Sequence, residues 1–486
     1  MSNTIANLEP KIVWKHFYSL TQIPRPSKKE SAVVDFVTKF GKDLGLETIV
    51  DEVGNVIIRK PATPGMENRK GIILQGHVDM VPQKNSDIKH DFEKDPIKTY
   101  IDGDWVTADG TTLGADNGIG VAAAMAVLED KTLVHGPIEA LFTVDEETGM
   151  TGAFNLKPNV LKGDILMNLD SEDEGELYVG CAGGIDANIK LAYTDEPAPA
   201  GYTFFKFDVS GLKGGHSGMD IILGRGNSIK LLFRFLRHAE VELGLRISSI
   251  DGGSLRNAIP REAFVVAGVP ADKVKLLEKA VSEYLNIYKQ EFAKVEPDLA
   301  FTAEKVESPK TVIDAKAQWG IIRSVFGCPN GVIRMSDAMP GLVETSTNLA
   351  RVYSEKGNIY AQCLLRSSVD SAKQALAEKM ASVFEMAGAE VVFDGAYPGW
   401  KPNMDSAILK TMSEVYKKNW GKTPEIKAIH AGLECGLLGG VYPNFDMISF
   451  GPTIRFPHSP DEKVKIDTVD MFWKFLVEAL KNAPKK

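Results

Sequence analysis

The sequence predicts an α/β protein with a mostly parallel sheet and an inserted α+β domain. Three observations support this. Apolar strands alternate with amphipathic helices at both ends of the chain, which is typical of a covered parallel sheet. Three of the strands stop abruptly at acidic or imidazole side chains. The chain has 486 residues, which is too long for one simple core and indicates two or three domains.

The N-terminal region begins with a helical pattern over residues 8–20, which the prolines of 23–27 (IPRPS) interrupt. A second helix is expected over residues 28–45, with Ser27 and Glu30 as a capping box. Strands are expected within residues 46–60 and at 71–76 (GIILQG). These segments supply the first helices and strands of the predicted sheet.

The alternation continues further along the chain. A helix is expected at 118–130, strands at 137–145 and 164–170, and near the C-terminus a strand at 447–451 followed by a helix at 469–482. Parallel strands place their carboxyl ends at one edge of a sheet. Residues that follow these strands are therefore expected to meet.

The middle of the chain has a different pattern. Residues 195–202 (DEPAPAGY) have the composition of a linker or turn. Two rounds of strand followed by helix come after them, at 253–284 and 345–388, which we interpret as a weak internal repeat. We predict a first domain part at 1–186, an inserted domain at 187–399 and a second part at 400–486.

The composition narrows the classes of function. The formal net charge is −9, from 56 basic and 65 acidic residues, and no long Lys/Arg cluster occurs, so no nucleic-acid partner is expected. No signal peptide or membrane-spanning apolar stretch is recognised, so no membrane association is expected. The four cysteines are far apart, without metal-site spacing, and favour a cytoplasmic protein with reduced thiols.

Metal-binding side chains recur at the predicted strand ends and in nearby loops. They are His77, Asp79, Asp116, Glu146, Glu147, Asp170 and His458. Carboxylates gathered at one sheet edge repel one another unless a cation neutralises them. Two divalent ions would balance three carboxylates and a bridging hydroxide. With two imidazoles, this set suits zinc and leaves cobalt and manganese open.

The motifs GHVDMV, GTTLGADNGIG, VDEETGM, NLDSE and GPTIRFPHSPDE resemble the aminoacyl-histidine (Xaa-His) dipeptidases of the PepD type. That group belongs to the dinuclear zinc peptidases, which include carnosinases and aminoacylases. The resemblance covers nearly the whole chain. It implies a zinc-peptidase catalytic domain with an inserted α+β lid domain and two bound divalent metal ions, with zinc expected first.

The resemblance also implies roles for individual residues. His77 and Asp170 would hold one ion, Glu147 and His458 the other, and Asp116 would bridge them. Asp79 would orient His77, and Glu146 would be the general base. Strand alternation alone says only that Glu146 and Glu147 point in opposite directions, so the choice of base comes from the resemblance, which further implies a cis peptide after Asp116.

Four further residues are expected to bind substrate by the same resemblance. His216, in a GGHSG loop of the lid, would stabilise the oxyanion. Asn257 would contact the substrate, and Arg366 would bind the terminal carboxylate of the substrate. Glu434 would belong to a substrate loop. Relatives often supply the lid histidine from a partner subunit, which implies a homodimer through the lid domain. The long lid leaves open whether His216 acts within its own chain.

We therefore predict a cytoplasmic metal-dependent exopeptidase that hydrolyses dipeptides of the Xaa-His kind, including β-alanyl-histidine. A tripeptidase or an N-acyl amino acid deacylase would use the same metal chemistry and is an alternative. A non-catalytic peptide-binding protein is the alternative from another class. It is disfavoured because both Asp79 and Glu146 and all five ligand candidates are present.

Overall fold

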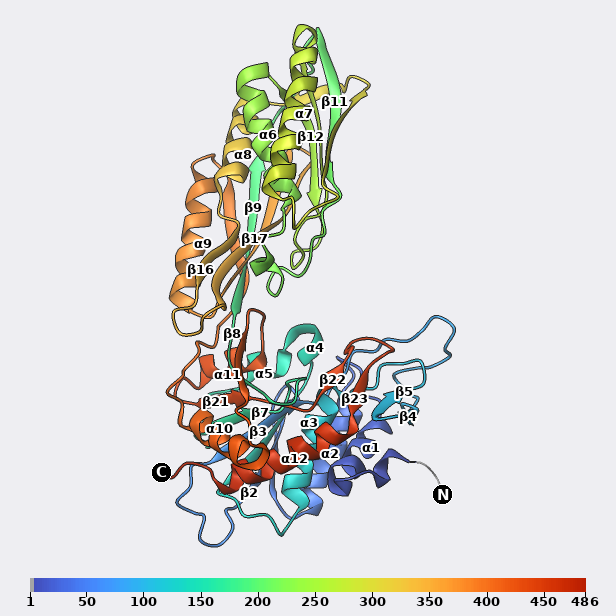
Figure 1. The fold of residues 1–486 in the computed structure, drawn as a ribbon, viewed down its shortest axis with the longest axis vertical. Helices are drawn as coiled ribbons and strands as arrows, with labels where there is room; N and C mark the ends of the chain where they lie inside the picture. The colour runs from blue at the N-terminus through green and yellow to red at the C-terminus, as the bar shows by residue number, and fades with distance from the viewer. Residues whose placement is uncertain (1–3) are drawn as a thin grey trace. The chain divides into compact units, whose positions relative to one another are not determined.

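The computed structural model describes residues 4–486, which form two compact units. Unit 1 comprises the described residues up to Gly180 together with Pro402–Ala428 and Leu433–Lys486, and unit 2 comprises Cys181–Lys401 and Ile429–Gly432. In Figure 1, unit 1 therefore combines the blue and the red ends of the chain. The sequence predicts boundaries a few residues away, at 186 and 399, and does not anticipate the return of 429–432 to unit 2.

Unit 1 is built on an eight-stranded sheet whose four central strands are parallel. The outer pairs β1–β2, β2–β6 and β21–β8 are antiparallel, so the sheet is mixed around a parallel core. The predicted α/β class is confirmed. In sheet order the strands are β1 (Glu47–Val50), β2 (Val56–Lys60), β6 (Ile138–Thr143), β3 (Ile72–His77), β7 (Ile165–Asn168), β21 (Asp446–Ser449), β8 (Glu176–Cys181) and β20 (Glu425–Ile429).

Helices cover this sheet. Helices α2, α3 and α10 contact sheet strands, while α1 and α12 pack on α3. Helix α3 is rich in alanine and nearly all of its residues are buried, as expected for a helix enclosed by others. The helices of unit 1 are η1 (Ile5–Asn7), α1 (Lys11–Thr21), α2 (Ser31–Asp43), α3 (Ala115–Glu129), α4 (Glu146–Gly149), α5 (Thr151–Asn155), α10 (Ala407–Trp420), α11 (Glu434–Val441) and α12 (Ile466–Lys481).

The predicted capping box at the start of α2 is wrong. The helix begins at Ser31, and its N-cap residue Glu30 makes no side-chain cap bond. The Ser27 hydroxyl instead donates to Oδ2 of Asp79 at 2.8 Å, and Glu30 accepts from the Lys28 amide. A partner far away in the sequence has replaced the local one.

A small four-stranded sheet completes unit 1 and frames the loop that carries His458. Its strands, in order, are β22 (Ile454–Arg455), β23 (Lys463–Lys465), β5 (Trp105–Ala108) and β4 (Thr99–Asp102). Phe456 and His458 adopt left-handed backbone angles, with φ of 56° and 59°. The loop between β22 and β23 is therefore tightly curled between two paired strands.

Unit 2 is an α+β domain with its own sheet and core. The two predicted repeats each contain a strand followed by a helix, β13–α7 and β18–α9. Four helices pack on the sheet: α6 (Ser228–Leu243), α7 (Val274–Glu291), α8 (Ala315–Gly327) and α9 (Asp370–Glu385). The nine strands are β14 (Ala300–Val306), β11 (Tyr202–Ser210), β13 (Ala263–Pro270), β12 (Arg246–Gly253), β17 (Val343–Glu355), β18 (Asn358–Ser367), β9 (Gly183–Ala192), β19 (Glu390–Tyr397) and, on the side of β17, β16 (Gly331–Met335).

Short elements complete unit 2. The predicted linker 195–202 contains a short strand, β10 (Asp195–Pro197), which pairs with β15 (Thr311–Ile313). Two 3₁₀ turns, η2 (Ile221–Leu223) and η3 (Ala271–Lys273), lie in the connections. The segment predicted as a linker or turn therefore contains one strand of a two-stranded ribbon, which its composition does not indicate.

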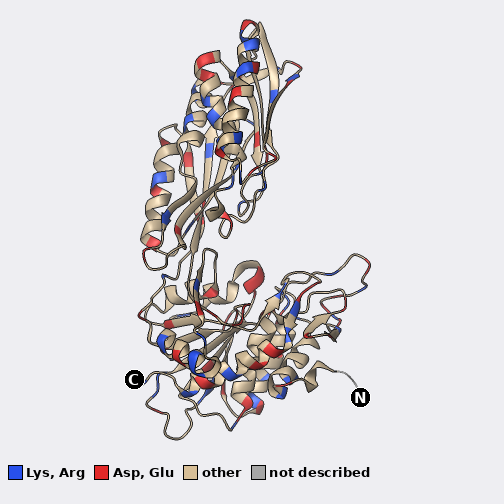
Figure 2. Ribbon diagram, in the orientation of Figure 1, with Lys and Arg blue, Asp and Glu red and all other residues tan. Residues whose placement is uncertain are grey.

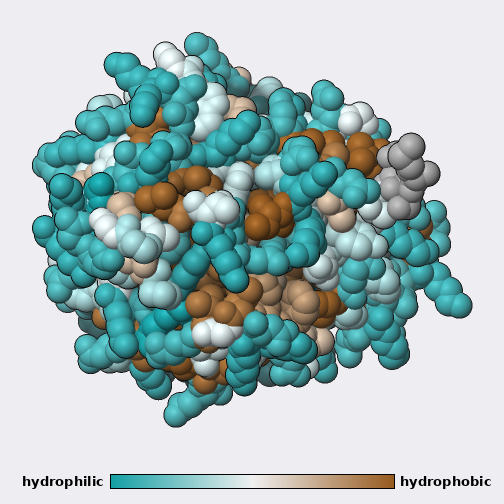
Figure 3. Space-filling view, turned by 90° about the horizontal axis from the view of Figure 1, so that it is seen from below, coloured by the Kyte–Doolittle hydropathy of each residue, from teal (hydrophilic) through white to brown (hydrophobic). Residues whose placement is uncertain are grey.

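The surface carries both signs of charge. Figure 2 shows Lys and Arg interspersed with Asp and Glu on the helices of each unit, with a concentration of acidic residues on α4. On the face seen in Figure 3, hydrophobic patches are separated by hydrophilic side chains. Within residues 4–486, none of the helices has the length and apolar character needed to cross a membrane.

Candidate active site

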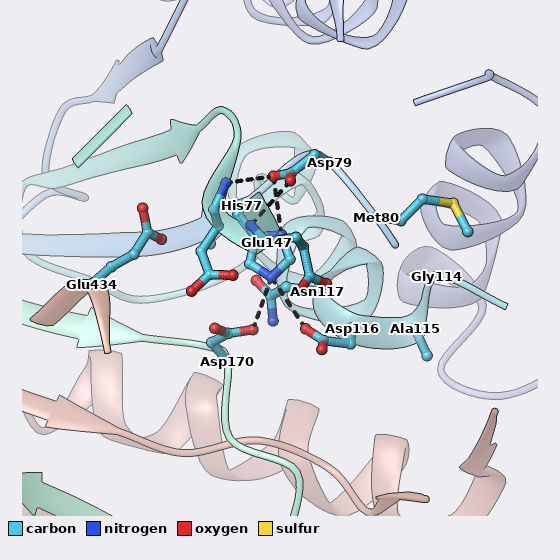
Figure 4. Close-up of polar contacts among 12 residues, drawn as sticks. His77, Asp79, Met80, Gly114, Ala115, Asp116, Asn117, Glu147, Asp170 and Glu434 are labelled. Atoms are coloured by element: carbon cyan, nitrogen blue, oxygen red, sulfur yellow. Dashed lines mark hydrogen bonds and ion pairs between the residues drawn. The ribbon is translucent and has the colours of Figure 1, made fainter. Parts of the chain in front are cut away.

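The carboxyl ends of three adjacent parallel strands carry most of the predicted site. β3 ends at His77 with Asp79 just beyond it, β6 leads into α4, which begins with Glu146 and Glu147, and Asp170 follows β7. Asp116 lies at the start of α3. Because parallel strands end at the same edge, side chains distant in sequence converge there, as Figure 4 shows.

The predicted ligands form two groups that share one carboxylate. Candidate donor atoms of His77, Asp116 and Asp170 lie within 4.8 Å of one another, as do those of Asp116, Glu147 and His458. Nε2 of His77 is 3.1 Å from Oδ1 of Asp116, and Nε2 of His458 is 3.3 Å from Oδ2 of the same residue. The two oxygens of Asp116 thus face different imidazoles.

Two further distances complete these groups. Asp170 Oδ1 lies 3.4 Å from Nε2 of His77, and Glu147 Oε2 lies 2.9 Å from Nε2 of His458. All five predicted ligands are therefore gathered within unit 1. The Asp116–Asn117 peptide is cis, in agreement with the expectation drawn from the resemblance.

Asp79 is fully buried and holds two parts of the site at once. Its Oδ1 lies 3.3 Å from Nδ1 of His77, and its two oxygens accept the backbone amides of Glu146 and Glu147 at 3.1 and 3.2 Å. Burial opposes the charge, but the adjacent His77 imidazole and hydrogen bonds from Ser27 and the Glu146 amide outweigh it and lower the pKa of Asp79 to about 2. A single carboxylate thus fixes the imidazole and the turn at α4.

The electrostatics of the site favour a bound cation. Burial and the neighbouring acidic groups raise the pKa of Asp170 and of Glu146, and they raise the pKa of Glu172 to about 8. Hydrogen bonds to Asp116 and Glu147 raise the pKa of His458 to about 11. Such crowding of negative charge is relieved when a cation enters.

The donor set also fits metal ions chemically. It mixes two imidazoles with three carboxylates, the ligand types that zinc, manganese and cobalt accept in proteins. Oε1 of Glu147 is buried without a hydrogen-bond partner among the described residues, so an acceptor atom is left for a cation. The groups that could hold metal are therefore present, and their chemistry leaves the identity of the metal open.

Glu434 is buried in contact with strands β3 and β6. It is 2% exposed, and its Oε2 accepts hydrogen bonds from Gln75 at 2.6 Å and Thr143 at 2.9 Å. Burial raises its pKa to about 7. The structure brings Glu434 next to the strands that carry the ligands, but encloses it more completely than expected for a residue on a substrate loop.

The other three predicted substrate residues lie in unit 2. Nδ1 of His216 accepts the amides of Gly218 and Met219, which leaves the proton of the neutral ring on Nε2. Arg366, on β18, donates to the Tyr397 hydroxyl at 3.1 Å, and its Nε is buried without a partner among the described residues. Two hydrogen-bond donors are therefore held ready in this unit.

Gly218 shows how closely these groups pack. A Cβ atom at Gly218 would lie 2.2 Å from the carbonyl oxygen of His430 and 3.3 Å from Nε of Arg366, so no larger residue fits. Asn257 is exposed, and its carbonyl accepts the Ser217 amide at 2.8 Å. The structure thus places Asn257 beside the His216 loop.

Sequence reasoning missed several residues that support the site. Arg25, Gln75, Thr143 and Glu462 are buried in unit 1, and Ser346 bonds to His430 in unit 2. A charged residue within the helix-breaking IPRPS, and the Glu that ends the GPTIRFPHSPDE motif, are signals that could have directed attention to Arg25 and Glu462. Gln75 sits inside an apolar strand, where a buried polar group needs partners.

Comparisons with known proteins agree with this geometry. The model of peptidase family M20/M25/M40 matches residues 73–482. The chain is 50% identical to the cytosol non-specific dipeptidase of Escherichia coli K12 over 483 residues, 99% of each chain. It is 51% identical to the crystal structure of an aminoacylhistidine dipeptidase from Vibrio alginolyticus, with a TM-score of 0.96 and coverage of 99% and 98%.

A more distant structure shares the fold. The aminopeptidase PepT of Bacillus cereus has a TM-score of 0.57 at 17% identity, with coverage of 98% of this chain and 99% of that one.

Proposed function

The chain belongs to peptidase family M20/M25/M40, and from this premise we propose that it is a metal-dependent dipeptidase acting on Xaa-His and other dipeptides. The observation that carries the proposal is the pair of ligand groups sharing Asp116 in a chain so similar to dipeptidases along its whole length. The name of the Vibrio relative supports histidine-containing dipeptides, and that of the Escherichia coli relative supports a broader range and a cytosolic location.

In this proposal the site holds two divalent cations, zinc first and cobalt or manganese as alternatives. His77 and Asp170 would bind one, Glu147 and His458 the other, and Asp116 both. When bound, such a pair lowers the pKa of a water and polarises the scissile carbonyl. Two observations support this assignment: Oε1 of Glu147 is buried without a hydrogen-bond partner among the described residues, and burial together with the neighbouring acidic groups raises the pKa of Asp170.

The chain's own residues would then move the proton. Glu146 would accept it from the attacking water and pass it to the leaving amine. The Asp79 carboxylate holds the amide of Glu146 and so would keep the base in place while it orients His77. The Nε2–H of His216 is a fixed donor suited to an oxyanion.

Substrate recognition is proposed for unit 2 and for Glu434. The buried guanidinium of Arg366 suits the terminal carboxylate of a dipeptide, because its fork matches a planar anion. Asn257, next to the His216 loop, offers an exposed amide. Glu434 would contribute to substrate binding from its buried position next to Gln75 and Thr143.

A homodimer through unit 2 is also proposed. Exposed apolar residues gather on η2 and β16, two elements in contact: Ile222, Leu223, Val332, Ile333 and Met335. Among the described strands β16 pairs only with β17, so its other edge is free to pair with a second subunit. Light scattering of purified protein, with activity measured at the same concentrations, tests this. Full activity of a monomer would mean that His216 acts within its own chain.

A substrate panel tests the proposed function. Purified protein is assayed with Xaa-His dipeptides, β-alanyl-histidine, other dipeptides, tripeptides and N-acetyl amino acids, with and without a chelator. We expect chelator-sensitive hydrolysis of dipeptides. Turnover restricted to tripeptides or N-acetyl amino acids would replace the dipeptidase assignment by one of those alternatives, and metal-free hydrolysis would overturn the mechanism.

A further inference from the structure

The backbone that leads into Asp116 is enclosed by two buried charged side chains that the proposed mechanism does not use. They are Glu462 and Arg25, each 2% exposed. The segment between them is Leu113–Asp116, whose last three residues are drawn in Figure 4. Charged groups are seldom buried so completely unless their hydrogen bonds are satisfied, so both side chains are expected to have several polar partners.

Glu462 accepts four consecutive backbone amides. Its Oε2 accepts from Leu113 at 2.8 Å and Gly114 at 2.9 Å, and its Oε1 accepts from Ala115 at 2.7 Å and Asp116 at 3.2 Å. Hydrogen bonds to an ionised acceptor are about twice as strong as neutral ones. The carboxylate therefore fixes the direction in which the chain enters α3 and presents Asp116.

Glu462 also belongs to the segment that supplies His458. Its own carbonyl accepts the Thr107 hydroxyl at 2.7 Å, and the residues after it form β23, which pairs with β5. The segment is thus anchored immediately after Glu462. The side chain of Glu462 consequently joins the segment that carries His458 to the segment that carries Asp116.

Arg25 binds the same segment through a carbonyl. One Nη2 hydrogen bond goes to the carbonyl of Gly114, while Nη1 donates to the carbonyls of Val78 and Asp79, both at 2.9 Å. Those two carbonyls follow His77 directly. Arg25 therefore joins the end of β3, with its predicted ligand, to the segment that carries Asp116.

Two glycines make room for the guanidinium. A Cβ atom at Gly114 would lie 2.6 Å from Nη2 of Arg25, and one at Gly118 would lie 2.7 Å from it. The three hydrogen bonds of the Arg25 guanidinium all go to backbone carbonyls, and among the acidic groups Glu462 does most to support its charge. The two oppositely charged side chains thus bind the same segment of backbone, Arg25 through the Gly114 carbonyl and Glu462 through four amides.

We propose that Arg25 and Glu462 are positioning residues that fix the spacing of the segments carrying His77, Asp116 and His458. This inference rests on the proposed function, because it assigns the three segments to metal binding. Neither residue is among the predicted metal ligands or substrate-binding residues. Each acts through the backbone, so the loss of either one loosens the ligand set without removing a ligand.

The test compares Glu462→Gln with a matched control, Glu139→Gln. Glu139 is also a buried carboxylate of unit 1 that accepts two backbone amides, from Lys162 and Gly163, both at 2.7 Å, but it lies on β6 away from the ligands. The Gln side chain at 462 turns one oxygen into an NH₂ group that faces two amide donors. Both substitutions therefore disturb a buried carboxylate that accepts backbone amides, but only Glu462 adjoins the proposed metal site.

The readouts are Co²⁺ affinity by competition with a chelating dye, the visible spectrum of the Co²⁺ protein, and kcat and KM on a dipeptide. We expect Glu462→Gln to weaken Co²⁺ binding about 10- to 100-fold, as loss of outer-shell support does, to shift the Co²⁺ spectrum and to lower kcat with little change in KM. Glu139→Gln should leave affinity and spectrum as in the wild type.

Arg25 provides the second variant pair, which keeps the test decisive if Glu462→Gln fails to fold. Arg25→Lys should retain more Co²⁺ affinity than Arg25→Met, because lysine keeps the charge although it cannot reach three carbonyls as a fork. Wild-type affinity and spectrum in Glu462→Gln or Arg25→Met, or equal losses in Glu139→Gln, would overturn the positioning role alone. A wild-type protein that neither binds Co²⁺ nor cleaves dipeptides would overturn the proposed function as well.

Discussion

Oδ1 of Asp79 lies 3.3 Å from Nδ1 of His77, on the opposite side of the imidazole from the Nε2 atom that faces Asp116. Asp79 therefore contacts the His77 ring at Nδ1, while Nε2 points toward Asp116 and Asp170. A carboxylate in this position fixes the tautomer and orientation of a ligand histidine and raises its basicity.

Replacing Asp79 by Asn should weaken metal binding and lower kcat/KM about 10- to 100-fold, because the amide cannot support His77 and the amides of α4 equally well. Metal affinity and steady-state kinetics measure this. Asp51→Asn is a suitable control, since Asp51 also accepts several backbone amides in unit 1 but none near the ligands. Equal losses in both variants would argue for a general folding defect.

Replacing Glu146 by Gln should lower kcat about 10²- to 10⁴-fold, which is the usual contribution of a general base. The substitution is isosteric, and the amide of residue 146 can still donate to Asp79. Metal content should therefore stay at the wild-type level while turnover falls. Near wild-type turnover of this variant would assign the base to another residue.

Removing metal by dialysis against a chelator should abolish dipeptide hydrolysis, and adding Zn²⁺, Co²⁺ or Mn²⁺ should restore it. The thermal midpoint of the metal-free protein should also be lower, since a ligand that binds only the folded state stabilises it. Calorimetry with and without each ion measures the shift. A midpoint indifferent to every ion would contradict tight binding at the five predicted ligands.

His430 should make unit 2 less stable in acid. Burial and the nearby Arg366 lower the pKa of this histidine to about 3, so the folded protein keeps the ring neutral. The unfolded chain takes up a proton below pH 6.5, and stability should fall as the pH drops from there toward 3, by at most about 1.4 kcal/mol per pH unit.

The variant His430→Gln isolates this effect. Glutamine can still pair with the Ser346 hydroxyl, which lies 2.7 Å from Nε2 of His430, but it does not titrate. Denaturant unfolding at several pH values should show a shallower decline for the variant between pH 6.5 and 3. Identical slopes for both proteins would exclude His430 as the source.

The sequence predicts the parts of the fold that local patterns encode. The apolar run at 72–74 begins β3, and of the residues that follow such runs, Asp79 and Asp170 both lie next to His77. A change from apolar to ligand-type residues at a strand end is a local signal. The topology of parallel strands then converts this signal into a spatial one.

The residues missed are those whose partners are distant and belong to the backbone. Arg25 bonds only to carbonyls, and Glu462 bonds to amides more than 300 positions away, so no spacing in the sequence reveals either. Ser27 shows the opposite error. Its local pattern predicts a helix cap, but the buried Asp79 accepts its proton instead. The sequence predicts Glu434 as a substrate residue, but not its buried hydrogen bonds, because these come from Gln75 and Thr143 on two separate strands.

Unit 1 is assembled from the two ends of the polypeptide, and this has a consequence for biosynthesis. The strand β21, the loop bearing His458 and the helix α12 leave the ribosome only after the whole of unit 2 has been made. Domains commonly fold in the order of their synthesis. Here the N-terminal part of unit 1 cannot complete its sheet when it emerges, because the β7 edge that pairs with β21 stays unpaired until β21 has been made. A nonsense codon late in the message would therefore yield a product that has most of its mass but lacks both a strand partner and an imidazole.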